Sequence, residues 1–375
     1  MDIEQKLSLL GGLSPAQFMR RHWHKKPLLI RAAVPGIEPL LSRTQLFALA
    51  AQEGVQSRLV VRQGRDWQLR HGPLPRRTLP PLHEGGWTVL LQGMDLQDES
   101  VHGLLQSFRF VPHARLDDLM ISYATDGGGV GPHFDSYDVF LLQVQGRRRW
   151  RIGRMRDPEL EEGVPLKILK HFEPEEEHVL EPGDMLYLPP RWAHDGIAEG
   201  ECMTYSIGFR APRRSELLRE VVARMIEAYE EELDEADDPL YRDPSQPATT
   251  EPGAIPPEMH EFARRAVHEL LADDGALARA LGEYLSEPKS HVAFEICEAD
   301  DVRQGVTLDR RTRMLYDEAH IYINGASYRA GGRDAALMRR LADERALDAR
   351  AVRQLSVDAL ELLQQWADDG WVRPA

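Results

Sequence analysis

The segment from Met120 to Trp150 constrains the fold more than any other part of the chain. It reads MISYATDGGGVGPHFDSYDVFLLQVQGRRRW, in which a glycine-rich bend separates two apolar stretches typical of β-strands. His133 and Asp135 follow the bend, two positions apart. Because side chains in a strand alternate between its faces, the imidazole and the carboxylate are predicted to point to the same side. A fold that uses this pair must bring a further ligand to the same point.

Short apolar segments separated by turn residues surround this stretch. A capping box at Ser14 predicts a short helix, and residues 101–111 suit another helix. Many short strands at close spacing predict a barrel or a double-sheet jelly roll for residues 1–211. The expected strands lie at 28–34, in a hairpin over 57–69, and at 87–94, 116–123 and 203–209.

The composition changes after about Pro212. Residues 212–285 are predicted to be a helical region with a proline-rich linker, whose first helix ends in the acidic run EEELDEADD. Residues 286–375 combine expected strands at 291–296 and 320–325 with two helices, which suggests a winged-helix-like domain. Dimerisation and substrate docking are both open as uses of this part, whereas its acidic residues argue against DNA binding.

The charge and cysteine content limit the partners and the compartment. Acidic residues outnumber basic ones 61 to 46, for a net charge of −15, so the surface repels nucleic-acid phosphates and favours a basic partner. The two cysteines lie far apart in the sequence, which fits a reducing compartment. Without a long apolar segment or a signal-like start, we expect a cytoplasmic protein that makes no contact with membranes.

A third ligand is available downstream, where EPGDMLYLPPRWAHDG presents a turn, a short strand and then His194. Two histidines and one carboxylate form the facial triad that holds non-haem Fe(II) and leaves coordination positions open. An oxygenase needs such positions, because a keto acid occupies two and dioxygen takes another. The other interpretation of the same ligands is a metal-binding cupin without oxygen chemistry. No Gly-Lys-Ser/Thr sequence follows the glycines, so a phosphate-binding loop is not supported.

A keto acid also needs a basic group for its far carboxylate, and Arg147, Arg148 and Arg149 are three candidates. If Trp150 and Ile152 pack inward, alternation places Arg148 on their face and its two neighbours on the solvated side. Arginine suits the task because its guanidinium forms paired hydrogen bonds with a carboxylate.

A substrate slot is predicted from the same alternation. Asp118, Met120 and Ser122 share one strand face, and Tyr137 continues the face of His133 and Asp135. An acid and an aromatic ring near the metal suit a cationic side chain, which the ring would stack on and the carboxylate would pair with. The alternative is that Met120 belongs to the core and Asp118 to a turn.

With these residues identified, the sequence resembles the JmjC-type 2-oxoglutarate oxygenases, and most closely the bacterial ribosomal oxygenases that hydroxylate an arginine of large-subunit ribosomal protein sixteen. The resemblance covers nearly the whole chain. It is carried by FMRRHWHKKPLLIRA, WTVLLQGMD, GGGVGPHFDSYDVFLLQVQGRRRW, EPGDMLYLPPRWAHDG and YSIGFRAP.

This resemblance implies Fe(II) bound by His133, Asp135 and His194, 2-oxoglutarate bound by Arg148, and O2 as co-reactant. It implies a substrate pocket with Asp118, Met120, Tyr137 and Ser206. It also implies a double-stranded β-helix, a helical region that forms a homodimer and a C-terminal winged helix. The expected reaction is hydroxylation of an arginine side-chain carbon, and the rival reaction at the same centre is demethylation of an N-methyl group.

Overall fold

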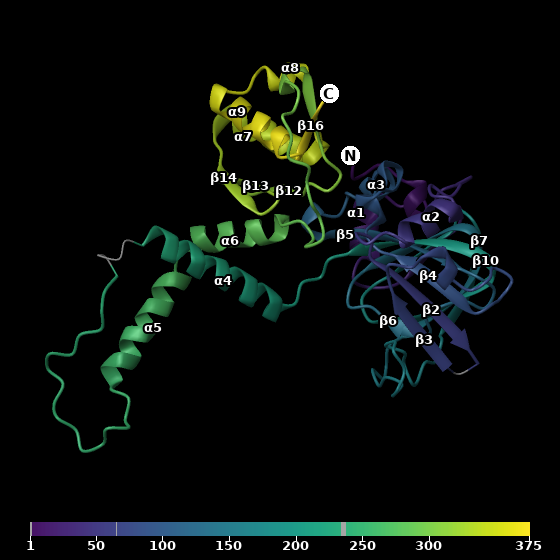
Figure 1. Ribbon diagram of the computed structural model, residues 1–375, viewed down its shortest axis with the longest axis horizontal. Helices are drawn as coiled ribbons and strands as arrows, with labels where there is room; N and C mark the ends of the chain where they lie inside the picture. Colours follow the sequence, from purple (N-terminus) through teal and green to yellow (C-terminus); the bar gives the residue numbers. More distant parts are fainter. Residues whose placement is uncertain (1, 65, 234–237) are drawn as a thin grey trace. The chain divides into compact units, whose positions relative to one another are not determined.

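The computed structural model describes residues 2–64, 66–233 and 238–375 (Figure 1). It divides into two compact units, Met1–Ala211 and Pro212–Ala375. The break between them falls where the composition of the sequence changes. The second expected boundary, after residue 285, lies within the second unit.

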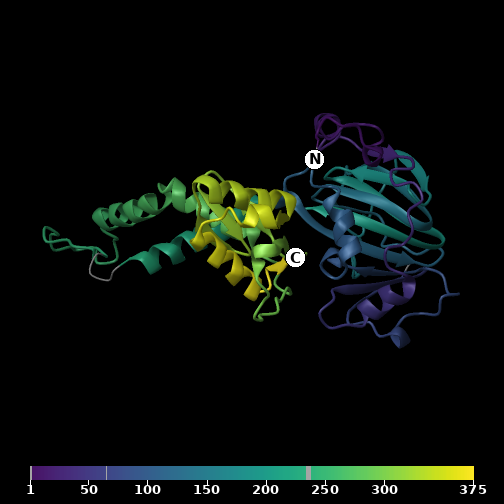
Figure 2. The same ribbon diagram turned by 90° about the horizontal axis from the view of Figure 1, so that it is seen from above.

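Antiparallel strands make up most of the first unit (Figures 1 and 2). Within the described residues, one sheet has the order β1-β9-β7-β10-β5-β4-β2-β3, with β6 paired to β10 and β8 paired to β7. The strands are β1 Leu28–Ile30, β2 Ser57–Gln63, β3 Asp66–His71, β4 Trp87–Leu91, β5 Leu116–Ala124, β6 His133–Phe134, β7 Val139–Arg154, β8 Glu176–Leu180, β9 Met185–Leu188 and β10 Trp192–Phe209.

Two long strands give this sheet its double-layered form. Strand β7 has 16 residues and pairs with β9 in its first part, with β8 in its last part, and with β10 along most of its length. Strand β10, with 18 residues, pairs with β5, β6 and β7. Because each long strand has different partners at its two ends, the sheet folds over on itself, and the predicted double-stranded β-helix is confirmed.

The two faces of the sheet bury different side chains. One face packs against α1 (Pro15–Arg21), α2 (Arg43–Ala50) and α3 (Glu99–Gln106), and Phe140 belongs to that core. Its neighbour Leu141 points the opposite way, toward the inside of the folded sheet, and belongs to a separate cluster there. We call this side of the sheet the inner face. The members of the inner cluster are Val139, Leu141, Trp150, Ile152, Leu180, Leu186 and Leu188.

The start of α1 follows from a local signal in the sequence. The Ser14 hydroxyl accepts a hydrogen bond from the Gln17 backbone N–H at 3.2 Å, and the Gln17 side chain accepts one from the Ser14 N–H at 3.2 Å. Two otherwise unpaired N–H groups are satisfied in this way, so the predicted capping box is confirmed.

Several expected elements of the first unit have different lengths in the structure. The strands expected at 28–34 and 87–94 are shorter and end at Ile30 and Leu91. The helix expected over 101–111 is α3, which ends at Gln106, because the chain then turns and buries Phe108 in the core. The strand expected over 203–209 is the last part of β10.

The second unit begins with α4 (Arg214–Glu232), α5 (Pro257–Leu271) and α6 (Asp274–Ser286). Asp273 separates the last two helices, since its side chain accepts a hydrogen bond from the Ala276 N–H and caps α6. Part of the acidic run at the end of α4, residues 234–237, lies outside the described residues.

Small sheets and further helices complete this unit. They are β11 Gly305–Leu308, β12 Met314–Tyr316, β13 His320–Ile323, β14 Ala326–Arg329, α7 Gly332–Glu344, β15 Ala346–Asp348, α8 Ala349–Val352, α9 Val357–Asp368 and β16 Val372–Pro374. Helix α6 contacts the sheet β12–β14, because the Tyr322 hydroxyl donates to the Ala278 carbonyl at 3.2 Å and its ring lies against Gly282. A boundary after residue 285 would therefore separate α6 from a sheet that it packs on.

The strand expected at 291–296 is wrong. That segment has no strand partner among the described residues, and side chains hold it in place instead. The Phe294 ring packs edge-on against Trp371 at 6.4 Å, and Arg311 donates to the Ala293 carbonyl. Alternating apolar residues therefore cover the end of a domain here without joining a sheet.

Among the described residues, no helix is both long enough and apolar enough to cross a lipid bilayer.

Asp309 supports a stability prediction for the second unit. Its side chain is 2% exposed and accepts hydrogen bonds from Arg311 at 2.8 Å and Arg373 at 2.5 Å. Burial opposes ionisation, but the two arginines prevail and lower the pKa of Asp309 from 3.8 to about 2. We expect Asp309→Asn to reduce the free energy of unfolding by about 2 kcal/mol at pH 7, because ionised Asp309 favours the folded state.

The pH dependence of this difference has a definite sign. Because the pKa of Asp309 is lower in the folded protein than in the unfolded chain, its ionised carboxylate stabilises the fold at pH values above the unfolded-state pKa. This contribution disappears as the pH falls from about 4 to about 2. Urea unfolding of both proteins at several pH values measures it. Equal stability of wild type and variant at pH 7 would contradict the prediction.

Candidate metal centre

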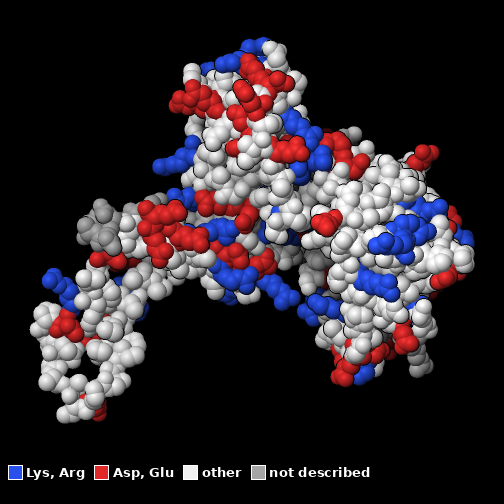
Figure 3. Space-filling model, viewed as in Figure 1, with Lys and Arg blue, Asp and Glu red and all other residues white. Residues whose placement is uncertain are grey.

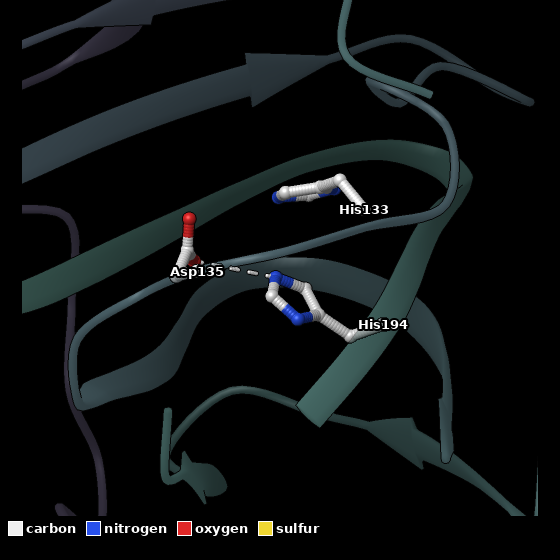
Figure 4. Close-up of side chains that lie close together, drawn as sticks. All are labelled: His133, Asp135 and His194. Atoms are coloured by element: carbon white, nitrogen blue, oxygen red, sulfur yellow. Dashed lines mark ion pairs between the residues drawn. The ribbon is translucent and has the colours of Figure 1, made fainter. Parts of the chain in front are cut away.

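His133, Asp135 and His194 converge at one end of the inner face (Figure 4). Strands β6 and β10 place the two histidines directly opposite each other, with ring centroids 4.2 Å apart. The His194 Nε2 atom lies 3.7 Å from a carboxylate oxygen of Asp135. The potential ligand atoms of the three residues all lie within 4.8 Å of one another, so a single ion can contact all of them.

The hydrogen bonds of the two histidines select the tautomer that binds metals. His133 Nδ1 lies 2.9 Å from the Gly131 carbonyl, and His194 Nδ1 lies 3.0 Å from the Trp192 carbonyl. A carbonyl oxygen only accepts, so each Nδ1 carries the proton and donates it. Each Nε2 then keeps a lone pair for a metal, and the ring orientation is held by the backbone.

The charge state of His194 also suits metal binding. It is 3% exposed, and burial together with the neighbouring His133 lowers the pKa of His194 from 6.5 to about 4. The imidazole is therefore neutral at pH 7, as a metal ligand must be.

The glycine-rich bend brings His133 and Asp135 close to β10. A Cβ atom on Gly129 would lie 2.5 Å from the Gly196 carbonyl oxygen, so only glycine allows this approach. The glycine-rich bend predicted from the sequence therefore passes directly beside the backbone of β10. The Arg191 N–H donates to the Asp135 carbonyl at 2.8 Å, which holds Asp135 next to the start of the same strand.

Arg148 lies on the inner face with Trp150 and Ile152, and it is 5% exposed. Its Nη1 donates to the Ser122 hydroxyl at 3.2 Å, and that hydroxyl donates to the Thr204 carbonyl at 3.3 Å. Its Nε and Nη2 atoms are buried and have no hydrogen-bond partner among the described residues. Leaving such donors unpaired costs free energy, so these N–H groups fit a carboxylate of a bound molecule.

The two flanking arginines point to the outside. Arg147 and Arg149 both pair with Glu199, and Arg149 pairs with Glu177 as well. Neither is available on the inner face.

Three of the four candidate substrate residues lie on the neighbouring strands β5 and β10, and Tyr137 lies in the bend between β6 and β7. Met120 of β5 lies directly opposite Ser206 of β10. Asp118 and Tyr137 both border Gly208, at 3.5 Å and 4.0 Å from the position that a Cβ atom would occupy there. Glycine at 208 therefore leaves space between an acid and an aromatic ring.

The electrostatic surroundings of these residues are negative. Asp118 accepts a hydrogen bond from the Gly93 N–H at 3.1 Å, and Tyr137 is 40% exposed. Desolvation and the Asp135 and Asp118 carboxylates raise the pKa of the Tyr137 hydroxyl above its usual value, so the hydroxyl remains protonated.

Another group of potential ligands lies elsewhere in the described part of the chain. It consists of Asp157, Glu159 and His171, all exposed. The Lys170 ammonium group already forms an ion pair with Glu159 at 2.6 Å, so we interpret this group as part of an exposed ion-pair cluster and not as a metal site.

The hydroxyl of Ser122 is a feature that the sequence did not reveal. Alternation placed Ser122 beside Asp118 and Met120, whereas its hydroxyl contacts Arg148, 26 residues away. The pairing of β5 with β10 and of β10 with β7 decides this contact, and no local signal in the sequence predicts it.

The comparisons with known proteins agree with this geometry. The family described as "JmjC domain" matches residues 103–217, and the "ROXA-like winged helix" matches residues 269–373. The ribosomal protein uL16 3-hydroxylase of Escherichia coli is 34% identical over 321 residues, which cover 82% of this chain and 83% of that protein. The probable ribosomal oxygenase of Haemophilus influenzae is 32% identical over 96% of both chains.

A solved structure extends the similarity to the fold. The structure of YcfD, a ribosomal oxygenase from Escherichia coli in complex with cobalt and 2-oxoglutarate, superposes with a TM-score of 0.77 at 30% identity, over 95% of this chain and 97% of that one. The order of a JmjC domain followed by a ROXA-like winged helix agrees with the two units of the fold. The chain therefore belongs to the JmjC-type ribosomal oxygenases, and its enzyme class is that of the 2-oxoglutarate-dependent oxygenases.

Proposed function

We propose that the protein uses Fe(II), 2-oxoglutarate and O2 to hydroxylate a side-chain carbon of an arginine in ribosomal protein uL16. The observation that supports this most is the arrangement of the inner face, where three metal-binding side chains lie on the same sheet as a buried arginine with two unpaired N–H groups. The relative named as a uL16 3-hydroxylase supports the choice of substrate. A ribosomal substrate also favours the cytoplasm as the location of the enzyme.

His133, Asp135 and His194 would hold the iron on one side and leave its other positions to ligands. When bound, Fe(II) with 2-oxoglutarate and O2 supplies the oxidation of a C–H bond, with succinate and carbon dioxide as co-products. The two histidines would bind through Nε2, because their Nδ1 atoms donate to backbone carbonyls.

Arg148 would bind the far carboxylate of 2-oxoglutarate through its unpaired Nε and Nη2. The Ser122 hydroxyl holds the remaining side of the guanidinium and so fixes its plane. Burial strengthens the ion pair, because water does not compete with the carboxylate at this site.

The substrate arginine would enter between Asp118 and Tyr137. The carboxylate would pair with the substrate guanidinium, and the phenol ring would stack on its plane. Met120 and Ser206, opposite each other on β5 and β10, would line the side of this slot that faces Ser122.

The experiment that tests this proposal is mass spectrometry of uL16 peptides incubated with the protein, Fe(II) and 2-oxoglutarate. A gain of about 16 Da on an arginine, together with succinate formation, supports hydroxylation. Formaldehyde release from methylated peptides would support demethylation instead. Absence of succinate under all conditions would leave a cupin that binds metal without oxidation.

We also propose that α5 contributes to a homodimer. No residue of this helix is buried, although it has apolar residues at helical spacing. Met259 is 42% exposed, Val267 58% and Leu271 44%, which is unusual for neighbouring apolar side chains on one helix face. A second copy of the chain would cover this face.

A charge placed on this face tests the dimer. Val267→Glu is expected to shift sedimentation velocity profiles from dimer to monomer, because a buried carboxylate at an interface is costly. The control is His268→Glu, which introduces the same side chain one position away on the polar face. A wild-type protein that sediments as a monomer, or equal behaviour of the two variants, would contradict the proposal.

The acidic surface of α4 and α6 (Figure 3) disfavours DNA binding by the second unit. Figure 3 shows acidic side chains gathered over α4 and α6, and Glu227, Glu230 and Glu231 are among the exposed ones on α4. Such a surface favours a cationic protein over a nucleic acid.

A further inference from the structure

The inner face of the sheet carries a second arginine, Arg58 of β2, that the proposed reaction does not use. Arg58 lies directly opposite Leu90 of β4, and Leu90 lies opposite Ser122 of β5. Residues paired in this way project from the same face of a sheet. The Arg58 side chain is therefore on the same side as Ser122 and Arg148.

The hydrogen bonds of Arg58 are incomplete. Its Nη2 donates to the Met120 sulfur at 3.9 Å, and a thioether is a weak acceptor. Its Nε is buried and has no partner in the described part of the chain. No carboxylate among residues 2–64, 66–233 and 238–375 forms an ion pair with it. A partly buried guanidinium without an oxygen acceptor is costly, so this site suits an oxygen atom of a bound molecule.

The neighbours of Arg58 indicate which molecule this is. Met120, which it contacts, is one of the candidate substrate residues. On the other side of β2, the residue opposite Arg58 in the strand register is His71 of β3, which is exposed and lies on the edge strand of the sheet. Arg58 therefore lies between the proposed slot and the solvent, while Arg148 and Ser122 already serve the far carboxylate of the cosubstrate.

We infer that Arg58 binds a main-chain carbonyl oxygen of the substrate peptide next to the arginine that is oxidised, an inference that rests on the proposed function. A carbonyl oxygen is the acceptor that any peptide offers, and the guanidinium can donate to it through more than one N–H. The positive charge of Arg58 also repels the substrate guanidinium, which directs it toward Asp118. Arg58 thus determines the specificity and the direction of the bound peptide.

The test uses the full-length protein and the uL16 peptide that wild type oxidises. Arg58→Gln is expected to raise the KM for the peptide roughly tenfold, as for the loss of one charge-assisted hydrogen bond, and to change the KM for 2-oxoglutarate by less than roughly twofold. Arg58→Lys keeps the positive charge but lacks the planar guanidinium. Its KM for the peptide is expected to lie between those of wild type and Arg58→Gln. Arg70→Gln is the matched control, because Arg70 is exposed on the neighbouring strand β3.

The outcomes separate this inference from the proposed function. If wild type oxidises no uL16 peptide, the proposed function itself fails. If wild type is active and the KM for the peptide is unchanged in both Arg58 variants, the inference is wrong. It is also wrong if the KM for 2-oxoglutarate rises, since Arg58 would then bind the cosubstrate. Thermal unfolding of each variant checks the fold, and Arg58→Lys provides the measurement should Arg58→Gln fail to fold.

Discussion

Replacing His133 with alanine is expected to reduce hydroxylation of the uL16 peptide by more than about 100-fold, because the variant lacks one of the three proposed metal ligands. Asp135 and His194 remain in place, but two protein ligands hold a divalent ion weakly, and no other His, Cys, Asp or Glu of the described residues joins this group. The gain of about 16 Da on the peptide and the formation of succinate should disappear together.

Metal binding gives a second and more direct measurement of the same change. Titration calorimetry with Mn(II) should show tight binding to wild type and a large loss of affinity in His133→Ala. The matched control is His171→Ala, which removes a histidine from the exposed group with Asp157 and Glu159. Full activity in His133→Ala, or an equal loss in both variants, would contradict the assignment of the metal ligands.

Replacing Arg148 with glutamine is expected to raise the KM for 2-oxoglutarate by about 100-fold, because the far carboxylate would lose the paired, buried, charged donor that we propose for it. The KM for the peptide should change far less. Arg148→Lys restores the charge, although an ammonium group presents no planar pair of donors and would not reach the same geometry. Its KM for 2-oxoglutarate is expected to lie between those of wild type and Arg148→Gln.

The neighbouring arginines provide the control for this prediction. Arg149→Gln removes the same group one position away, where the side chain pairs with Glu177 and Glu199 on the outside. Steady-state kinetics at varied 2-oxoglutarate should therefore leave Arg149→Gln close to wild type. A larger effect in Arg149→Gln than in Arg148→Gln would show that the strand faces the other way.

Alternation within one strand allowed the sequence to predict several of these positions. The spacing of His133 and Asp135 predicted a shared face, and the same period separated Arg148 from Arg147 and Arg149. Capping residues predicted the start of α1 at Ser14 in the same manner. These features depend on backbone geometry over a few residues, so a short stretch of sequence determines them.

Other features depend on contacts between residues far apart in the chain. The sequence offered His194 as a third ligand, but only the pairing of β10 with β6 sets it opposite His133. Likewise, the strand expected at 291–296 had a suitable pattern, yet its side chains pack against Trp371 and Arg311 and it pairs with no strand that the structure describes.

The inner face shows most clearly which features follow from local sequence and which depend on long-range contacts. The sequence by itself determined which side chains of β5 and β7 share a face, since that follows from the period of a strand. Only the tertiary structure decided that Ser122 contacts Arg148 and that Arg58 contacts Met120. The physical reason is that strand order and register are set by the packing of both faces of the sheet, which involves the whole first unit at once.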